Sequence, residues 1–240
     1  MNEVTSLRIN KFISETGYCS RREADKLVEA GEVTINGVKA VLGSQADLGD
    51  IVCVSGTRIG EQKKHVYIAL YKPTGITCTT ELHIEGNIVE FINHEERIFP
   101  IGRLDKDSEG LILLTNDGDV VNPILRSEGK HEKEYIVTVD KPVTASFLKG
   151  MSEGVHILGS MTLPCKLTRI GDHTFKIVLT EGRNRQIRRM CDAFGYKVRR
   201  LKRVRIMNIH LAELPKGEWR ELTEDEKGVL FRDIHYQPTN

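Results

Sequence analysis

The arrangement of apolar residues changes near residue 60, and this change limits the possible folds more than any other feature of the 240-residue sequence. Before it, short segments carry apolar residues at helical spacing. After it, apolar runs of strand length alternate with turns. A chain of this length can hold one large domain or two smaller ones. We therefore expect a small N-terminal domain at 1–60, a linker at 61–65 and a larger domain at 66–240.

The N-terminal segment predicts two helices followed by a small sheet. A first short helix has its apolar face at Leu7, Ile9, Phe12 and Ile13. The sequence Ser-Arg-Arg-Glu at 20–23 is a capping box that begins a second helix, and Gly31 ends it. Asn36-Gly37 predicts a tight turn between two strands, and 47–50 a turn into a third. The polar stretch 57–65 then predicts the region of the linker.

The larger domain is predicted to be α+β, with a mixed, largely antiparallel sheet. Helices occur among the strands without the strict alternation of parallel α/β folds. Thr144 predicts the start of a short helix that runs through Lys149. Strands are expected at 66–70, 98–101, 111–114, 135–139 and 175–179.

Several classes of protein are excluded by what the sequence lacks. No run of about 18 apolar residues could span a membrane, and the N-terminus lacks a secretory signal pattern. The five cysteines are scattered, without a CxxC pair or zinc-ligand spacing. We expect a cytoplasmic protein with no membrane segment, no disulfide framework and no bound metal.

The charge is neutral on average but concentrated locally. The net charge is +1, yet the segment 183–205 is dense in arginine and lysine and holds one acid, Asp192. Such a segment favours a polyanionic partner on one face. A solvated charged surface is the alternative interpretation.

Two loops or strand ends carry candidate chemical groups. Asp105 lies in a loop, 102–110, between two apolar strands, where a carboxylate is held by the sheet and still reachable. On spacing alone an aspartate of this kind is more often a turn former. Tyr135 begins a strand and could offer a flat face to a base, although a core tyrosine is the commoner case.

The basic segment contains two elements. Residues 181–190 open a helix, whose N-terminus and arginines could bind phosphate, although any one of them could form a structural ion pair. In 197–205, Val198 and Val204 are expected on one strand face, with Leu201 breaking the alternation as at a bulge. Basic side chains here suit a phosphate backbone.

Together these motifs resemble those of the bacterial ribosomal RNA pseudouridine synthases. Residues 8–54 look like an S4 RNA-binding domain, and Gly-Arg-Leu-Asp at 102–105 looks like the family's signature loop. Lys-Glu-Tyr at 133–135, 181–190 and 217–223 complete the pattern in order. One departure is visible: Tyr71 stands before Lys72-Pro73 where an asparagine is expected.

The resemblance implies an isomerisation without a cofactor. A uracil is detached from its ribose, turned over and rejoined through carbon. Asp105 matches the essential aspartate, acting as nucleophile or base on sugar or base. Arg188 matches the arginine that pairs with it, Tyr135 the tyrosine that stacks on the target base, and Arg103 the arginine that enters the RNA stack.

The resemblance also implies the partner, which is ribosomal RNA, with the large subunit first and small-subunit RNA or tRNA left open. We expect a monomer. A non-catalytic RNA-binding assembly factor is the alternative, whereas a methyltransferase would need a GxGxxG loop that is absent. The basic residues predicted to contact RNA are Arg21, Arg22, Lys26, Arg103, Arg183, Arg185, Arg189, Arg199, Arg200, Lys202 and Arg203.

Overall fold

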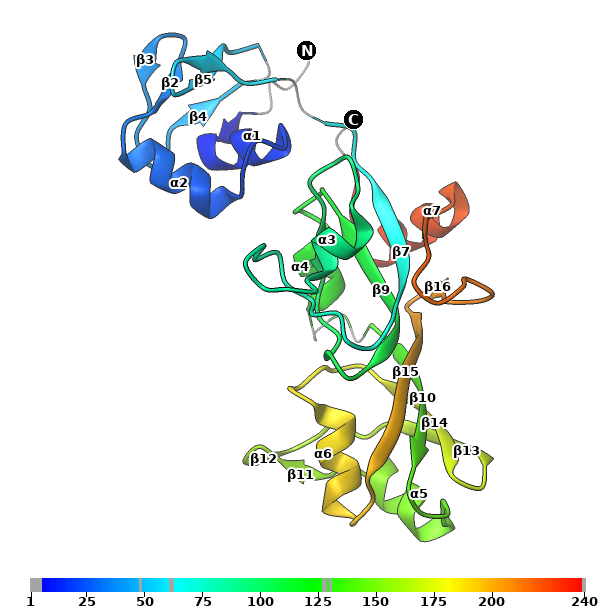
Figure 1. The fold of residues 1–240 in the computed structure, drawn as a ribbon. Helices are drawn as coiled ribbons and strands as arrows, with labels where there is room; N and C mark the ends of the chain where they lie inside the picture. The colour runs from blue at the N-terminus through cyan, green and yellow to red at the C-terminus, as the bar shows by residue number, and fades with distance from the viewer. Residues whose placement is uncertain (1–5, 48, 61–62, 127–128, 130, 239–240) are drawn as a thin grey trace. The chain divides into compact units, whose positions relative to one another are not determined.

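A computed structural model describes residues 6–47, 49–60, 63–126, 129 and 131–238 (Figure 1). The chain divides into two compact units, 1–65 and 66–240. Leu48 of the predicted turn and residues 61–62 of the predicted linker lie outside the described residues. None of the helices among the described residues is long and apolar enough to cross a lipid bilayer.

The first unit contains the two predicted helices and small sheets. Helix α2 begins with the predicted capping box: the Ser20 hydroxyl accepts the Glu23 amide at 3.2 Å, and the Ser20 amide donates to the Glu23 carboxylate at 2.7 Å. The elements are α1 (Ile9–Glu15), α2 (Arg21–Glu29), a sheet of order β3 (Val38–Lys39), β2 (Val33–Ile35), β5 (Val52–Val54) and β6 (Thr57–Arg58), and the pair β1 (Leu7–Arg8) and β4 (Gln45–Ala46).

The sheet of this unit contains one turn that the sequence predicted and one strand that the prediction missed. Asn36 and Gly37 have φ angles of 50° and 82°, as a tight hairpin turn with two left-handed residues requires. Strand β6 lies inside the stretch predicted as linker, because Thr57 and Arg58 pair with Val54 and Cys53 of β5. Polarity marked this stretch as a loop, although an edge strand can also be polar.

The second unit is built on a nine-stranded sheet, mixed and largely antiparallel as predicted. Among the described residues, β9 and β15 form its one parallel pair of neighbours. The order along the sheet is β13 (Lys166–Gly171), β14 (Thr174–Leu179), β10 (Lys133–Val139), β15 (Val198–Ile206), β9 (Glu109–Thr115), β7 (Tyr67–Lys72) and β17 (Trp219–Glu221), with β8 (Phe99–Ile101) on β9 and β16 (Ile209–His210) on β15.

Helices cover both faces of one half of this sheet. On β7, alternate side chains serve different cores: Ile68 packs in the cluster that contains α3 (Ile88–Ile92), and Ala69 in the one that contains α4 (Val121–Leu125) and α7 (Glu224–Asp233). In the other half, α5 (Ala145–Ser152) and α6 (Gln186–Ala193) share a core with β10 and β14. Thr144 caps α5 as predicted.

The residues that strand β15 buries differ from those expected from a regular alternation of side chains between its two faces. Leu201, Arg203 and Ile206 are buried, whereas Val198 and Val204 are only half-buried. The pairing with β10 skips a residue twice, near both ends of the strand, and each skip leaves one residue without a partner in the register. Two bulges therefore change the face that each following side chain occupies.

The parallel pair needs a glycine on β9. Gly110 has φ = 111°, and a Cβ there would lie 2.2 Å from the carbonyl oxygen of Arg203 on β15. No other residue type fits this close approach of two backbones. The start of β9 is thereby fixed against β15, and with it the end of the loop that carries Asp105.

Candidate active site

The loop between β8 and β9 holds Asp105 firmly and leaves it accessible. The Ser108 amide donates to the Asp105 carbonyl at 3.0 Å, which closes a turn. Leu104, next to Asp105, is buried, and its carbonyl accepts from the Cys78 thiol at 3.2 Å. The Asp105 side chain remains 32% exposed. A carboxylate on a fixed loop at a surface hollow can reach a substrate without rearrangement.

A second loop, 73–76, supports the first from β7. Lys72 is fully buried, and its ammonium donates to the carbonyls of Pro73 at 2.8 Å and Ile76 at 3.0 Å. The Gly75 amide in turn donates to the Lys106 carbonyl at 2.7 Å. Burial lowers the pKa of Lys72, since the charged form loses its hydration. These contacts connect the end of β7 to the residue after Asp105.

Two arginines from the α6 region reach this loop, and the structure corrects the predicted pairing. Arg185, not Arg188, lies beside Asp105, with 3.7 Å between guanidinium and carboxylate. Arg185 also binds Asp107 through two parallel bonds of 3.0 Å. Arg188 instead donates to the Asp107 carbonyl and the Ser108 hydroxyl, each at 3.0 Å. The hydrogen bond from Arg185 holds the pKa of Asp107 below its ordinary value.

A cavity of about 490 Å³ opens beside Asp105. Its polar wall includes Asp105 and Tyr135, and the guanidinium carbon of Arg203 lies 6.0 Å from the Tyr135 ring centroid. Its apolar wall is formed by Leu104, Leu179, Ile187 and Leu201, among others. A flat aromatic face, apolar walls and the Asp105 carboxylate suit a planar heterocycle whose sugar bond lies at that acid.

A second cavity, of about 520 Å³, meets the first at the same loop. Arg103, Leu104, Asp105 and Arg185 line both. Arg103 is exposed, and its predicted entry into the RNA stack stays a prediction. Asp105 therefore lies on a ridge between two hollows.

The structure brings only part of the predicted RNA-contact set to these cavities. Among the predicted basic contacts, those that line the first cavity are Arg103, Arg183, Arg185 and Arg203. In the first unit Arg21, Arg22 and Lys26 are exposed on α2, as is Arg199 on β15. Lys202 is half-buried, with its ammonium 5.0 Å from the ring centroid of Tyr71.

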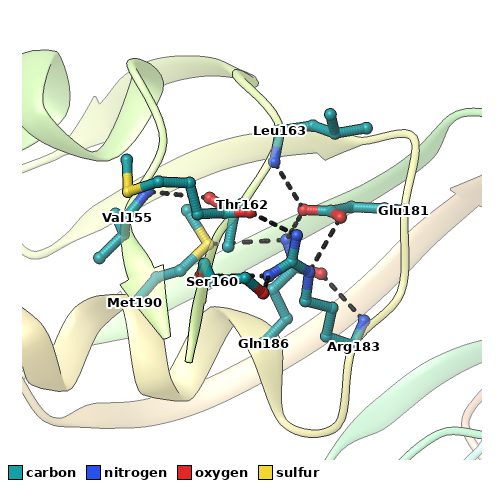
Figure 2. A network of polar contacts seen from close by, with 9 residues as sticks. Val155, Ser160, Thr162, Leu163, Glu181, Arg183, Gln186 and Met190 are labelled. Atoms are coloured by element: carbon teal, nitrogen blue, oxygen red, sulfur yellow. Dashed lines mark hydrogen bonds and ion pairs between the residues drawn. The ribbon is translucent and has the colours of Figure 1, made fainter. Parts of the chain in front are cut away.

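Other members of that set are engaged within the protein. Arg203 is 4% exposed and donates to the Leu111 carbonyl at 2.7 Å, so it faces the first cavity and not an open surface. Arg200 binds the buried carboxylate of Glu109 at 2.5 Å, and Arg189 binds Asn184. Arg183 is bound by a neighbouring hairpin and by Glu181 (Figure 2). The density of charge did not reveal these internal partners.

The sequence analysis did not single out Lys133, although it lines the first cavity. Burial lowers its pKa, with Arg203 adding to the effect. A signal existed, because Lys133 lies two residues before Tyr135 on one strand and so shares its face. The roles of Cys78 and Ser108, which act through backbone and arginine contacts, had no such signal.

Comparison with known proteins assigns both units. The model of the RNA pseudouridylate synthase family matches residues 66–193, and the S4 domain model matches residues 7–52. The dual-specificity RNA pseudouridine synthase RluF of Escherichia coli is 56% identical over 232 residues, which cover 96% of this chain and 80% of that protein.

Two further relatives agree. The ribosomal large subunit pseudouridine synthase B of Bacillus subtilis is 35% identical over 91% of this chain and 93% of its own. A crystal structure of a pseudouridylate synthase, 33% identical, superimposes with a TM-score of 0.69 over 93% of this chain and 99% of that one.

Proposed function

The chain belongs to the RNA pseudouridylate synthase family, and we propose that it isomerises a specific uridine of large-subunit ribosomal RNA through Asp105. The observation that carries the proposal is the position of Asp105, half-exposed at the edge of a cavity that also presents Tyr135. The name of the Bacillus subtilis relative supports the large subunit. The name of the Escherichia coli relative, dual-specificity, favours a second RNA, for which we propose tRNA.

In the proposed reaction the bond from the ribose carbon C1′ to the base nitrogen N1 breaks. A bond from C1′ to the ring carbon C5 replaces it, C5 loses its proton and N1 gains one. The atoms balance without a redox step. Asp105 acts on the sugar or the base as nucleophile or base. Arg185 lies beside it, with 3.7 Å between guanidinium and carboxylate, and can hold the carboxylate in place.

The uridine must leave its stack before C1′ can be reached, at a cost of a few kcal/mol. Tyr135 offers a face on which the flipped base can stack, and Arg103, exposed beside Asp105, can occupy the space left in the RNA. Phosphate contacts from Arg21, Arg22 and Lys26 on the S4 domain would offset the cost. We propose that the enzyme acts as a cytoplasmic monomer.

The test uses RNA fragments tritiated at uracil C5. Wild-type protein is expected to release tritium from a large-subunit fragment, whereas Asp105→Asn, which keeps the shape but removes the charge, is expected to release none. RNA affinity measured on the same samples controls for folding. Release by neither protein, with binding retained, would favour a non-catalytic RNA-binding factor. Tritium release from small-subunit RNA only would assign small-subunit RNA as the substrate instead.

A further inference from the structure

The arginine loop that reaches Asp105 is held at its base by a network of hydrogen bonds among residues that line the first cavity and a neighbouring hairpin (Figure 2). Its centre is the Glu181 carboxylate, whose side chain is 11% exposed. Three donors converge on it: the Leu163 amide at 2.9 Å, Gln186 Nε2 at 2.8 Å and Arg183 Nε at 3.1 Å. An ionised carboxylate can accept from all three, because its two oxygens together offer about four lone pairs.

Arg183 extends this network to the hairpin of β11 (His156–Ile157) and β12 (Ser160–Met161). Its Nη1 donates to the Ser160 carbonyl at 3.2 Å and hydroxyl at 2.9 Å, and its Nη2 donates to the Met161 carbonyl. Every nitrogen of the guanidinium thus has a partner inside the protein. An arginine engaged in this way has most of its donors already used inside the protein.

The network fixes both ends of a four-residue loop, 182–185. Glu181 precedes the loop and Gln186 follows it. They are joined directly, and the Arg183 amide donates to Gln186 Oε1 at 3.0 Å. Within the loop Arg185 adopts φ = 51°, a left-handed conformation that persists in residues other than glycine only where the surroundings enforce it. That conformation directs its guanidinium to Asp107 and Asp105.

We propose that Glu181 and Arg183 are positioning residues, which hold loop 182–185 so that Arg185 reaches Asp105 and Asp107. The inference rests on the proposed function for its kinetic consequence and stands on geometry for the rest. It also assigns Arg183 a different role from the RNA contact that its charge suggests. The two roles predict opposite outcomes, since a phosphate contact changes affinity and its salt dependence, whereas a positioning residue changes rate.

The deciding experiment is a carboxyl NMR titration of Asp107 in Glu181→Gln. Glutamine keeps the size but replaces an acceptor oxygen with a donor amide, so one of the three donors loses its partner. We expect Arg185 to move away and the pKa of Asp107 to rise toward its ordinary value of 3.8. Glu153→Gln, at an exposed glutamate that ends helix α5, is the matched control. An unchanged Asp107 pKa in a folded variant would overturn the proposal, whatever the protein catalyses.

Kinetics on the same variant and on Arg183→Gln give the second measurement. Single-turnover pseudouridine formation is expected to fall about tenfold or more, because displacement of a catalytic group by about 1 Å costs rate steeply. The RNA Kd and the slope of its logarithm against salt should stay as in the wild type. A weaker Kd with a slope lowered by about 0.7, the value of one lost phosphate contact, would contradict the proposal. Arg183→Gln serves if Glu181→Gln does not fold.

Discussion

Basic residues are used in opposite ways in α2 and in the segment before and within α6. On α2, Arg21, Arg22 and Lys26 are exposed, with no ion pair among the described residues. At 183–189 every arginine has a partner inside the protein. Both segments are rich in basic residues, but only those on α2 leave their charged groups open to a partner. An arginine is available to RNA only if its guanidinium is not already bound.

The neighbouring acceptors explain the difference. Helix α2 buries Ala24 and Val28 in its own core and leaves its charged face toward solvent. The segment 183–189 instead faces Glu181, Asp107 and the end of a hairpin. Arginine forks match carboxylates and carbonyls bidentately, so they are the natural cross-links between loops. The predictions below test this contrast, from the largest expected effect to the smallest.

The largest effect, on stability, is expected at Gly110, where the backbones of β9 and β15 approach most closely beside the buried Arg203. Gly110→Ala would place a Cβ 2.2 Å from the Arg203 carbonyl, at a φ that alanine disfavours. We expect a loss of about 4 kcal/mol or more in the free energy of unfolding, measured in urea. Gly118→Ala is the control, because a Cβ there meets nothing within 4 Å. Equal stability of the two variants would contradict the account.

The next effect concerns rate. Arg188 is 13% exposed on its side chain and joins the Asp107 carbonyl to the Ser108 hydroxyl. Arg188→Lys loses this fork, and we expect single-turnover formation of pseudouridine to fall by about 100-fold, with RNA affinity nearly unchanged. Arg189→Lys, one residue on and bound among the described residues only to Asn184, should change the rate little. Equal losses would mean that the helix as a whole was disturbed.

A small effect on stability should depend on pH. The pKa of Asp107 is lowered in the folded protein, so its contribution is present at neutral pH and is lost as pH falls through the folded pKa. Its side chain is 49% exposed, so we expect less than about 1 kcal/mol. The stability gap between wild type and Asp107→Asn should close as pH drops from 7 to below 3.8. A gap independent of pH would contradict this.

Local sequence signals predicted much of the fold. The capping box at Ser20, the turn at Asn36-Gly37 and the cap at Thr144 all act within a few residues, and the structure contains each of them. Strand β15 does bulge, but at Arg199 and Val204 and not at Leu201, because the bulges depend on pairing with β10, which is distant in sequence. Strand β6 was missed for a different reason: it pairs with β5 across the two-residue turn Ser55-Gly56, and its polar residues were interpreted as a loop.

The sequence predicted which residues form the site, but not which arginine pairs with which carboxylate. The motif placed Asp105, Tyr135 and the arginine segment together, and they do line one cavity. Which arginine faces Asp105 depends on the left-handed backbone of Arg185, and no residue type at that position announces it. The burial of Arg203 likewise depends on the bulge that shifts its face of the strand.

The contrast between the two basic segments is tested most directly by one matched pair, Arg22→Gln and Arg183→Gln. RNA affinity over a range of salt and the single-turnover rate at saturating RNA are measured for both. Arg22→Gln should weaken binding and lower the salt slope by about 0.7 while the rate holds. Arg183→Gln should keep affinity and slope while the rate falls. If both variants weaken binding with the same change in slope, the division between RNA-binding and positioning arginines is wrong.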